Sequence, residues 1–152
     1  MPEEKVRVKV ERIPGQEDVP LPVYETEGAS GMDIRAAVRE AVVLGPGEIA
    51  LVPTGLKVAI PWGYEAQIRA RSGLALKNGI GLVNAPGTID SDYRGEIRLI
   101  MINWGQEPFT IHRGDRIGQM IIHKVLRAEL MEVETLDSTE RGEGGFGHSG
   151  VD

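Results

Sequence analysis

Short apolar segments, bounded by glycine or proline, recur through the first 126 residues. At 6–11, valines alternate with charged residues, which is the period-two pattern of a strand with one buried face. Another strand is predicted near 64–70. The apolar runs at 97–102 and 117–125 are short and rich in isoleucine, so they predict two central strands. The pattern is typical of a β protein.

A glycine-rich turn divides the segment 41–60. We interpret this segment as a hairpin around residues 45–47, Gly-Pro-Gly, followed by a further strand. Pro53 and Gly55 then mark a bend or a sheet edge, because proline cannot donate a ladder hydrogen bond and glycine weakens a strand interior.

Two stretches have a helical pattern. Residues 32–44 include IRAAVREAVV, whose local propensity is ambiguous between helix and strand. Ser72, followed by LALKN, is predicted to cap a helix of one or two turns. A helix start leaves backbone N–H groups unpaired, and such groups attract anions.

Glycine and proline are frequent, with 20 and 9 copies in 152 residues. Between residues 14 and 118 the longest run without either is 13 residues, which argues against a helical bundle. The length fits one domain with a real core. We therefore predict one β domain over residues 1–136. The glycine-rich residues 137–152 are expected to be a flexible lid, because they cannot bury enough surface to fold alone.

Composition and charge exclude several classes of protein. No apolar run approaches the roughly 20 residues of a membrane span, and the acidic start lacks the features of a secretory signal. The chain has no cysteine, so thiolate catalysis and disulfides are excluded and a cytoplasmic location is expected. Seven aromatic residues and no dense basic cluster argue against nucleic acid as a partner.

The charge is unevenly distributed along the chain. Of the formal net charge of -6, most belongs to residues 127–152, which carry 2 basic and 7 acidic side chains, whereas the body is nearly neutral. Arginines are frequent between positions 69 and 98, where few acids accompany them. A small anionic ligand is therefore compatible with an acidic chain.

The densest polar cluster lies at 84–97, NAPGTIDSDYRGEI, and predicts a tight β-hairpin. Asp90 follows an apolar pair near its turn, so its carboxylate is placed to direct a water molecule as a general base. The alternative is that Asp90 and Ser91 only satisfy the turn. This segment alone leaves both interpretations open.

Four other segments carry polar groups. Each has a structural explanation by itself, since glycines form turns, arginines cover surfaces and a free terminus is commonly disordered. They are GMDIRAA at 31–37, RSGLALKNG at 71–79, GDRIGQMII at 114–122 and RGEGGFGHSG at 141–150.

Taken together, the five segments resemble the deoxyuridine triphosphatase family, the trimeric dUTP pyrophosphatases, in order and approximate spacing. The resemblance spans about residues 5–150. GTIDSDYRGE at 87–96 and RGEGGFG at 141–147 are its most specific motifs. It implies an all-β subunit, a distorted jelly roll or β-barrel-like fold with one short helix.

The resemblance implies the reaction as well. Family members hydrolyse dUTP to dUMP and pyrophosphate, which supplies dUMP for dTMP synthesis and keeps uracil out of DNA. A water attacks the α-phosphorus, and Asp90 matches the residue that activates it. Mg²⁺ is implied as cofactor, held mainly by substrate phosphates and waters, so no protein metal ligand is expected.

The resemblance also assigns substrate contacts. Asp33 is implied to support a network of waters and arginines, Asn84 to select uracil, and Tyr93 to pack on the deoxyribose and exclude a 2′-hydroxyl. The implied phosphate-binding residues are Arg71, Ser72, Gly73 and Gln119; the implied hairpin contacts to uracil are Gly87, Thr88, Ile89 and Arg98; the implied lid contacts are Arg141, Phe146 and Ser149.

Family members form homotrimers in which three subunits share each site, and this assembly is implied here. Two departures from the family pattern occur. Ala70 replaces the usual proline before Arg-Ser-Gly, and His148-Ser149 replaces the usual Ser/Thr pair. At the second departure, Ser149 supplies one hydroxyl for the terminal phosphate.

Two other functions are considered. A dCTP deaminase shares the fold but requires a glutamate on the strand after the hairpin, where this chain has Ile100. A non-catalytic β assembly module would be expected to lose the base, the hairpin or the tail. Asp90, Tyr93, Arg141 and Phe146 are all present, so hydrolysis of dUTP is the preferred hypothesis.

Overall fold

The computed structural model describes residues 4–151 and contains ten strands and one short helix within that range. The elements are β1 (Lys9–Arg12), β2 (Met32–Arg35), β3 (Val42–Leu44), β4 (Ile49–Ala59), β5 (Tyr64–Arg69), α1 (Ser72–Asn78), β6 (Ile80–Leu82), β7 (Gly87–Ile89), β8 (Glu96–Asn103), β9 (Phe109–Ile111) and β10 (Arg116–Lys124). The predicted all-β fold with one short helix is confirmed.

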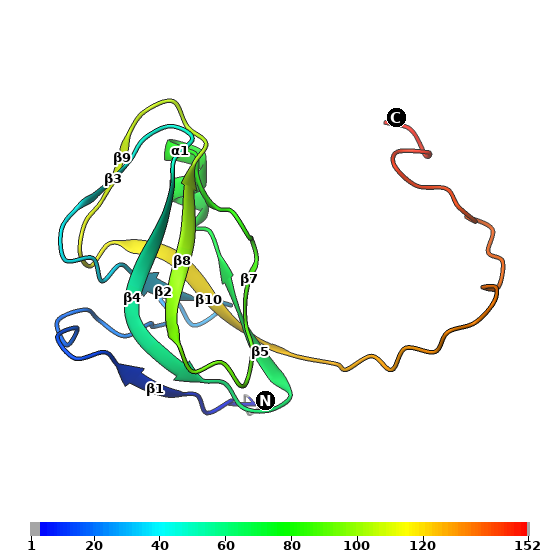
Figure 1. Cartoon of the computed structure of the whole chain (residues 1–152), viewed down its shortest axis with the longest axis horizontal. Helices are drawn as coiled ribbons and strands as arrows, with labels where there is room; N and C mark the ends of the chain where they lie inside the picture. The colour runs from blue at the N-terminus through cyan, green and yellow to red at the C-terminus, as the bar shows by residue number, and fades with distance from the viewer. Residues whose placement is uncertain (1–3, 152) are drawn as a thin grey trace.

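Two antiparallel four-stranded sheets form the body (Figure 1), in the orders β1-β4-β8-β6 and β2-β10-β5-β7. β3 and β9 pair separately as a two-stranded sheet. β8 and β10 both lie inside their sheets, so the prediction of central strands at 97–102 and 117–125 is confirmed. The strand predicted at 64–70 is β5, and the one at 6–11 is shorter, starting at Lys9.

The core lies between the two large sheets, because the strands alternate buried and exposed residues (for example along β8) and turn their apolar faces toward each other. The fully buried side chains that contribute most volume are Ile34, Leu44, Val52, Leu99, Met101, Ile111 and Ile117.

Asn103 is a buried polar residue at the end of β8. Its amide nitrogen donates to the carbonyls of Leu44 and Glu107, each at 2.8 Å, and its amide oxygen accepts from the N–H of Gly105 at 2.8 Å. The side chain thus fastens β8 to the loops that surround β3 and β9.

We expect an Asn103→Leu variant to unfold at lower urea concentration, with a loss of about 3 kcal/mol, because three backbone groups lose their partner. Equilibrium urea unfolding followed by circular dichroism measures this loss. Gln106→Ala, at an exposed position nearby, is the control and is expected to change stability by less than about 0.5 kcal/mol. Equal midpoints for Asn103→Leu and the parent would contradict the prediction.

The helix at Ser72 is confirmed, but its cap differs from the prediction. Arg71 occupies the N-cap position with extended backbone, no side chain caps the helix, and Ser72 is the first helical residue. The helix ends at Gly79, whose left-handed conformation (φ 69°) lets its N–H bond back to the carbonyls of Ala75 and Leu74.

Residues 32–44 form β2 and β3 with a loop between them, and not a helix. β2 pairs along β10, with Asp33 opposite Gln119, and β3 pairs with β9. Ile34 is fully buried from β2. The pairing to distant strands therefore overrides the ambiguous local propensity.

Neither predicted hairpin has its two strands paired. β3 pairs with β9, while β4 continues through Pro53 and Gly55 with an irregular register and pairs with β1 and β8. In the segment 84–97, β7 pairs with β5 and β8 pairs with β4 and β6, so these two strands belong to different sheets. The turn at 90–95 therefore crosses from one sheet to the other.

Two surface ion pairs hold the N-terminal segment against the body. Lys124 contacts Glu4 at 3.1 Å and lowers the pKa of that carboxyl, mainly through the hydrogen bond. Arg113 contacts Asp18 at 2.6 Å and lowers its pKa in the same way. Because these pKa values are lowered, both contributions are present near neutral pH and are lost as the pH falls through the lowered values. Exposure keeps each contribution small.

The chain leaves the body after β10 and runs outward as an extended tail (Figure 1). Val125 still donates its N–H to the carbonyl of Gly63 at 2.8 Å. Residues 126–143 are all exposed, and the short turns at 139–150 bond only to themselves. Within residues 4–151 no helix combines the length and hydrophobicity needed to span a bilayer.

Candidate active site

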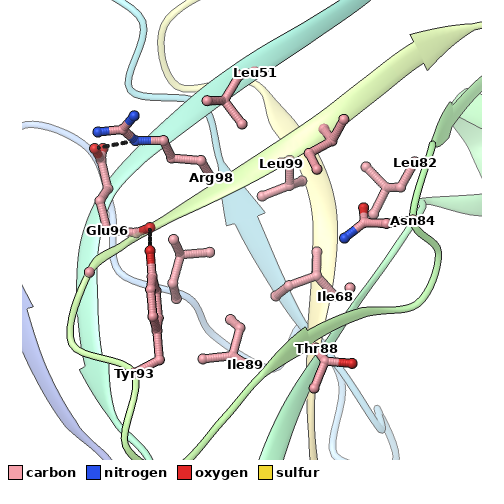
Figure 2. A pocket seen from close by; sticks show the side chains of 14 residues that line it. Leu51, Ile68, Leu82, Asn84, Thr88, Ile89, Tyr93, Glu96, Arg98 and Leu99 are labelled. Atoms are coloured by element: carbon pink, nitrogen blue, oxygen red, sulfur yellow. Dashed lines mark hydrogen bonds and ion pairs between the residues drawn. The ribbon is translucent and has the colours of Figure 1, made fainter.

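A cavity of about 500 Å³ opens between β7 and β8, where the two sheets separate. Figure 2 shows Asn84 at one side, Tyr93 at the other, and the apolar side chains of Ile68, Ile89 and Leu99 between them. Thr88 and Gly87 line it from β7. The cavity is large enough for a small planar ligand and has polar groups at its margins.

Glu96 organises the β8 side of this cavity. Its backbone carbonyl accepts the Tyr93 hydroxyl at 3.0 Å, and its carboxylate accepts from Arg98 Nε at 3.0 Å (Figure 2). The carboxylate also accepts from the Gly55 N–H at 3.0 Å. The Tyr93 ring lies over Gly95, where any Cβ would overlap the ring. These contacts fix the orientation of Tyr93 at the mouth of the cavity.

A second cluster is centred on Asp33 of β2, a buried carboxylate. Arg71 Nε lies 3.5 Å from one carboxylate oxygen and Arg116 Nη1 lies 3.2 Å from the other. Gln119 of β10 stands opposite Asp33 in the sheet register and opposite Arg69 on its other side. Asp33 therefore neutralises part of an arginine-rich surface and orients two guanidinium groups.

Beside this cluster lies a cavity of about 360 Å³. Its charged lining consists of three arginines and one aspartate, Arg35, Arg71, Arg116 and Asp115. Ser72 and Gly73, at the adjacent start of α1, are exposed. A guanidinium-lined hollow of this kind suits phosphate or carboxylate groups, which arginine binds through two parallel hydrogen bonds.

Asp90 lies at the turn between β7 and β8, outside the lining of the cavity that holds Tyr93. It borders a third hollow of about 570 Å³ together with Glu65, Trp62 and the root of the tail. The Asp90 carbonyl accepts the Tyr93 N–H at 3.2 Å. The turn therefore links the candidate base to the candidate sugar contact through the backbone.

The predicted lid residues Arg141, Phe146 and Ser149 line none of these three hollows. Arg141 Nε donates to the Gly144 carbonyl at 2.8 Å, and Phe146 is fully exposed. Ser149 is exposed too. Within a single chain, the predicted residues thus form separate groups. The cavity between β7 and β8 is lined by Asn84, Gly87, Thr88, Ile89, Tyr93 and Arg98, and Asp90 lies next to it. The second group consists of Asp33, Arg71 and Gln119 with Ser72 and Gly73 nearby, and the third consists of Arg141, Phe146 and Ser149 on the tail.

Sequence reasoning missed Arg116 and Glu96, which hold the Asp33 cluster and the Tyr93 ring in place. Both stand inside the quoted segments GDRIGQMII and GTIDSDYRGE. Their presence there was a signal, but only the folded chain shows which residue each one touches.

The two-sheet fold, with a slot for a planar group and a guanidinium-lined hollow, is compatible with a nucleotide-binding β protein. Comparison with known families gives the same class and a narrower identity. Residues 17–150 match the dUTPase family model, and the chain belongs to this family.

Curated relatives match over nearly their whole length. The chain is 58 % identical over 146 residues to "Deoxyuridine 5'-triphosphate nucleotidohydrolase" of Fusobacterium nucleatum, covering 96 % of this chain and 98 % of the relative. It is 59 % identical over 147 residues to the protein of the same name from Anaeromyxobacter sp. (strain Fw109-5), covering 95 % and 98 %. The resemblance stated from the sequence motifs is confirmed.

A solved structure shows the same fold. The dUTPase of Staphylococcus bacteriophage 80alpha with dUPNHPP superposes with a TM-score of 0.85 at 28 % identity, covering 95 % of this chain and 99 % of that one. The jelly-roll-like fold of such structures confirms the predicted fold class.

Proposed function

We propose that this chain hydrolyses dUTP to dUMP and pyrophosphate. The observation that carries the proposal is the cavity between β7 and β8, bounded by Asn84 and Tyr93, in a chain that belongs to the dUTPase family. The relatives named above carry the corresponding activity in their names, and the phage 80alpha enzyme is described with dUPNHPP. In the cell this reaction would supply dUMP for dTMP synthesis and keep uracil out of DNA, and we place it in the cytoplasm.

Uracil would enter the cavity between β7 and β8. Among residues 4–151, β7 pairs only with β5, so its other edge has no strand partner there and its N–H and C=O groups can face the cavity. These backbone groups, with the Asn84 amide, supply donors and acceptors that match the edge of a base. Thr88, Ile89 and Arg98 are then positioned mainly for backbone contact, and the Arg98 guanidinium is engaged by Glu96.

Tyr93 would pack against the deoxyribose. Because the Glu96 carbonyl and Gly95 hold the ring in place, the ring has little freedom to make room for a 2′-hydroxyl. This steric argument supports the exclusion of ribonucleotides.

We expect Tyr93→Ala to reduce the preference for dUTP over UTP by at least about tenfold in kcat/KM, which corresponds to about 1.4 kcal/mol. Parallel steady-state assays of pyrophosphate release from dUTP and UTP measure the ratio. Tyr93→Phe, which keeps the ring and loses only the bond to Glu96, is the control and is expected to retain most of the preference. An unchanged ratio in Tyr93→Ala contradicts the assignment.

The phosphate groups would bind at the second cluster. Arg71 supplies charge, and its pairing with the buried Asp33 fixes its direction. Ser72 and Gly73 are exposed at the start of α1, with open space above Gly73. The Gln119 side chain lies against Gly31, and a Cβ at position 31 would lie 3.2 Å from the Gln119 amide oxygen. These four residues form a surface that can approach phosphate oxygens.

Asp90 would act as the general base. Its carboxylate is exposed, and within the described chain no hydrogen bond or ion pair occupies it. It takes a proton from water as the water oxygen bonds to the α-phosphorus, while the bond from that phosphorus to the bridging oxygen breaks and pyrophosphate leaves. Positioning and charge neutralisation supply most of such catalysis.

The residues on the chain fit a Mg²⁺ ion held mainly through the substrate. Within residues 4–151 no group of three or more His, Cys, Asp or Glu side chains is placed to bind a metal, and Asp33 is already paired with two arginines. Mg²⁺ commonly takes phosphate oxygens and waters as ligands, and it would neutralise charge on the triphosphate. A mutant dUTPase of phage phi11 of S. aureus, similar in fold at 24 % identity, is described with a structural Mg(II) ion.

We infer that the working unit is a homotrimer that shares its sites. The nucleoside cavity, the arginine cluster and the tail are separate in one chain, and the tail points away from the body (Figure 1). In a shared site the segment 84–97 would come from one subunit, the phosphate cluster from a second, and Arg141, Phe146 and Ser149 from a third. No nucleic acid or membrane is required.

One assay separates this function from its alternatives. Incubation with dUTP, dCTP or dTTP plus Mg²⁺ is expected to release pyrophosphate from dUTP alone and no ammonia. Ammonia from dCTP would indicate a deaminase. This result is not expected, because the apolar Ile100 lines the nucleoside cavity at the position where a deaminase has its glutamate. No release from any nucleotide would indicate a non-catalytic assembly module.

A further inference from the structure

Arg127, two residues after the last main-chain bond of the tail to the body, lies over the ring of Trp62. The guanidinium carbon is 5.1 Å from the ring centroid, within the range of a cation–π contact. Trp62 belongs to the turn between β4 and β5 and is largely exposed. The contact therefore joins the root of the tail to the surface of the body.

Within the described residues, no hydrogen bond joins the tail to the body beyond this contact. The Val125 N–H bonds to Gly63, Leu126 is exposed, and beyond Arg127 the hydrogen bonds of the tail are all internal. The 14 residues from Arg127 to Arg141 reach at most about 50 Å when extended. Arg127 thus lies at the point where the tail leaves the body.

The root of the tail also borders the catalytic turn. Trp62, Arg127 and the turn residues Asp90 and Asp92 line one hollow of about 570 Å³. The tail therefore leaves the body beside this turn.

Resting on the proposed function, we propose that Arg127 is a positioning residue: its stacking on Trp62 aims the tail so that Arg141 and Phe146 reach a neighbouring subunit's substrate. Without the contact, the root is free to point in more directions, and fewer of them bring the lid to its site. The free energy of the cation–π contact sets the upper limit on how far it can shift the equilibrium between the open and the closed lid.

The expected effect is small but specific. An exposed cation–π contact corresponds to a factor of about two to five in an equilibrium constant. Because the same residues meet the substrate once the lid is closed, KM for dUTP is expected to rise two- to fivefold in Arg127→Ala or Trp62→Ala, with kcat changed by less than about twofold. Arg127→Lys, which keeps the cation, is expected to restore most of the affinity.

The double variant Arg127→Ala/Trp62→Ala is expected to be no worse than either single variant, because both remove one contact. Arg39→Ala is the charge-matched control. Arg39 is exposed in the loop after β2 and has no hydrogen bond or ion pair in the described chain. Additive losses, an equal rise in KM for Arg39→Ala, or unchanged KM in both single variants would overturn the proposal.

A spectroscopic readout tests the contact without turnover. The chain has two tryptophans, Trp62 and Trp104, so a Trp104→Phe background isolates the fluorescence of Trp62. We expect stronger acrylamide quenching of Trp62 when Arg127→Ala is added. Unchanged quenching overturns the contact itself. A parent enzyme that releases no pyrophosphate from dUTP overturns the proposed function and the positioning role with it, but leaves the quenching result, and so the contact, intact.

Discussion

An Asp90→Asn enzyme is expected to release pyrophosphate from dUTP about 10²–10⁴ times more slowly than the parent, the range that a positioned general base contributes. The amide has the size of the carboxylate but cannot take the proton from water. Because Asp90 is exposed at the turn between β7 and β8, the substitution is not expected to disturb the core. The loss is therefore expected in kcat.

A binding measurement distinguishes a variant that has lost only the general base from one whose substrate site is damaged. We expect Asp90→Asn to bind the non-hydrolysable analogue dUPNHPP with an affinity within a few-fold of the parent, measured by calorimetry. Glu65→Gln is the matched control, since it makes the same carboxylate-to-amide change in a residue that borders the same hollow. Near-normal turnover by Asp90→Asn, or an equal loss in Glu65→Gln, would show that Asp90 is not the base.

The second large effect concerns the tail. A chain that ends at Leu136 lacks Arg141, Phe146 and Ser149, and we expect its kcat/KM for dUTP to fall by at least about 100-fold because substrate is no longer covered and separated from water. The body should keep its stability, since within the described residues no hydrogen bond joins residues 137–151 to it. Urea unfolding of the truncated chain checks this point.

Mixing the two inactive chains tests whether sites are shared. If hairpin and lid come from different subunits, an equimolar co-assembly of Asp90→Asn chains with truncated chains contains intact sites. With random assembly, about a quarter of the sites combine an intact Asp90 with an intact tail. Pyrophosphate release near a quarter of the parent rate is therefore expected.

Two results would contradict this arrangement. Activity that stays at the level of the separate inactive chains would show that each site draws base and lid from one subunit. A monomeric mass for the fully active parent, measured by light scattering at micromolar concentration, would exclude sharing altogether. The control is separately assembled chains mixed without exchange, which should remain inactive.

Most strands were predictable because their signals are local. The alternation or apolar runs of β5, β8 and β10 correspond to the strands observed, and Ser72 to Asn78 form the predicted helix. The segment 32–44 was ambiguous for the same reason. Its local propensity gives no information on the pairing of β2 with β10, because the two strands are about 80 residues apart in the chain.

Pairing was the least predictable feature. A glycine-rich turn such as 45–47 shows that the chain changes direction, but it does not show which strand each flank will bond to. β3 joins β9 and not β4, and β7 and β8 join opposite sheets. The choice depends on which distant backbone edges and apolar faces become available together.

The motifs named the candidate residues, but their grouping is a property of the folded chain. Asp33 and Arg71 are distant in sequence and form an ion pair with Arg116 as the third member. Asp90 and Tyr93 are three residues apart, yet they border different hollows. Their roles in the reaction stay predictions until the variants above are measured.

The class of fold, the positions of most strands and the family could be predicted from the amino-acid sequence, because periodicity, turn residues and motif order are local features of the chain. The folded chain adds that the segment 84–97 lines a cavity between two sheets, that Asp33 pairs with two arginines, and that Arg127 lies over Trp62. These features depend on contacts between residues far apart in the chain, and the packing of the two sheets sets their geometry.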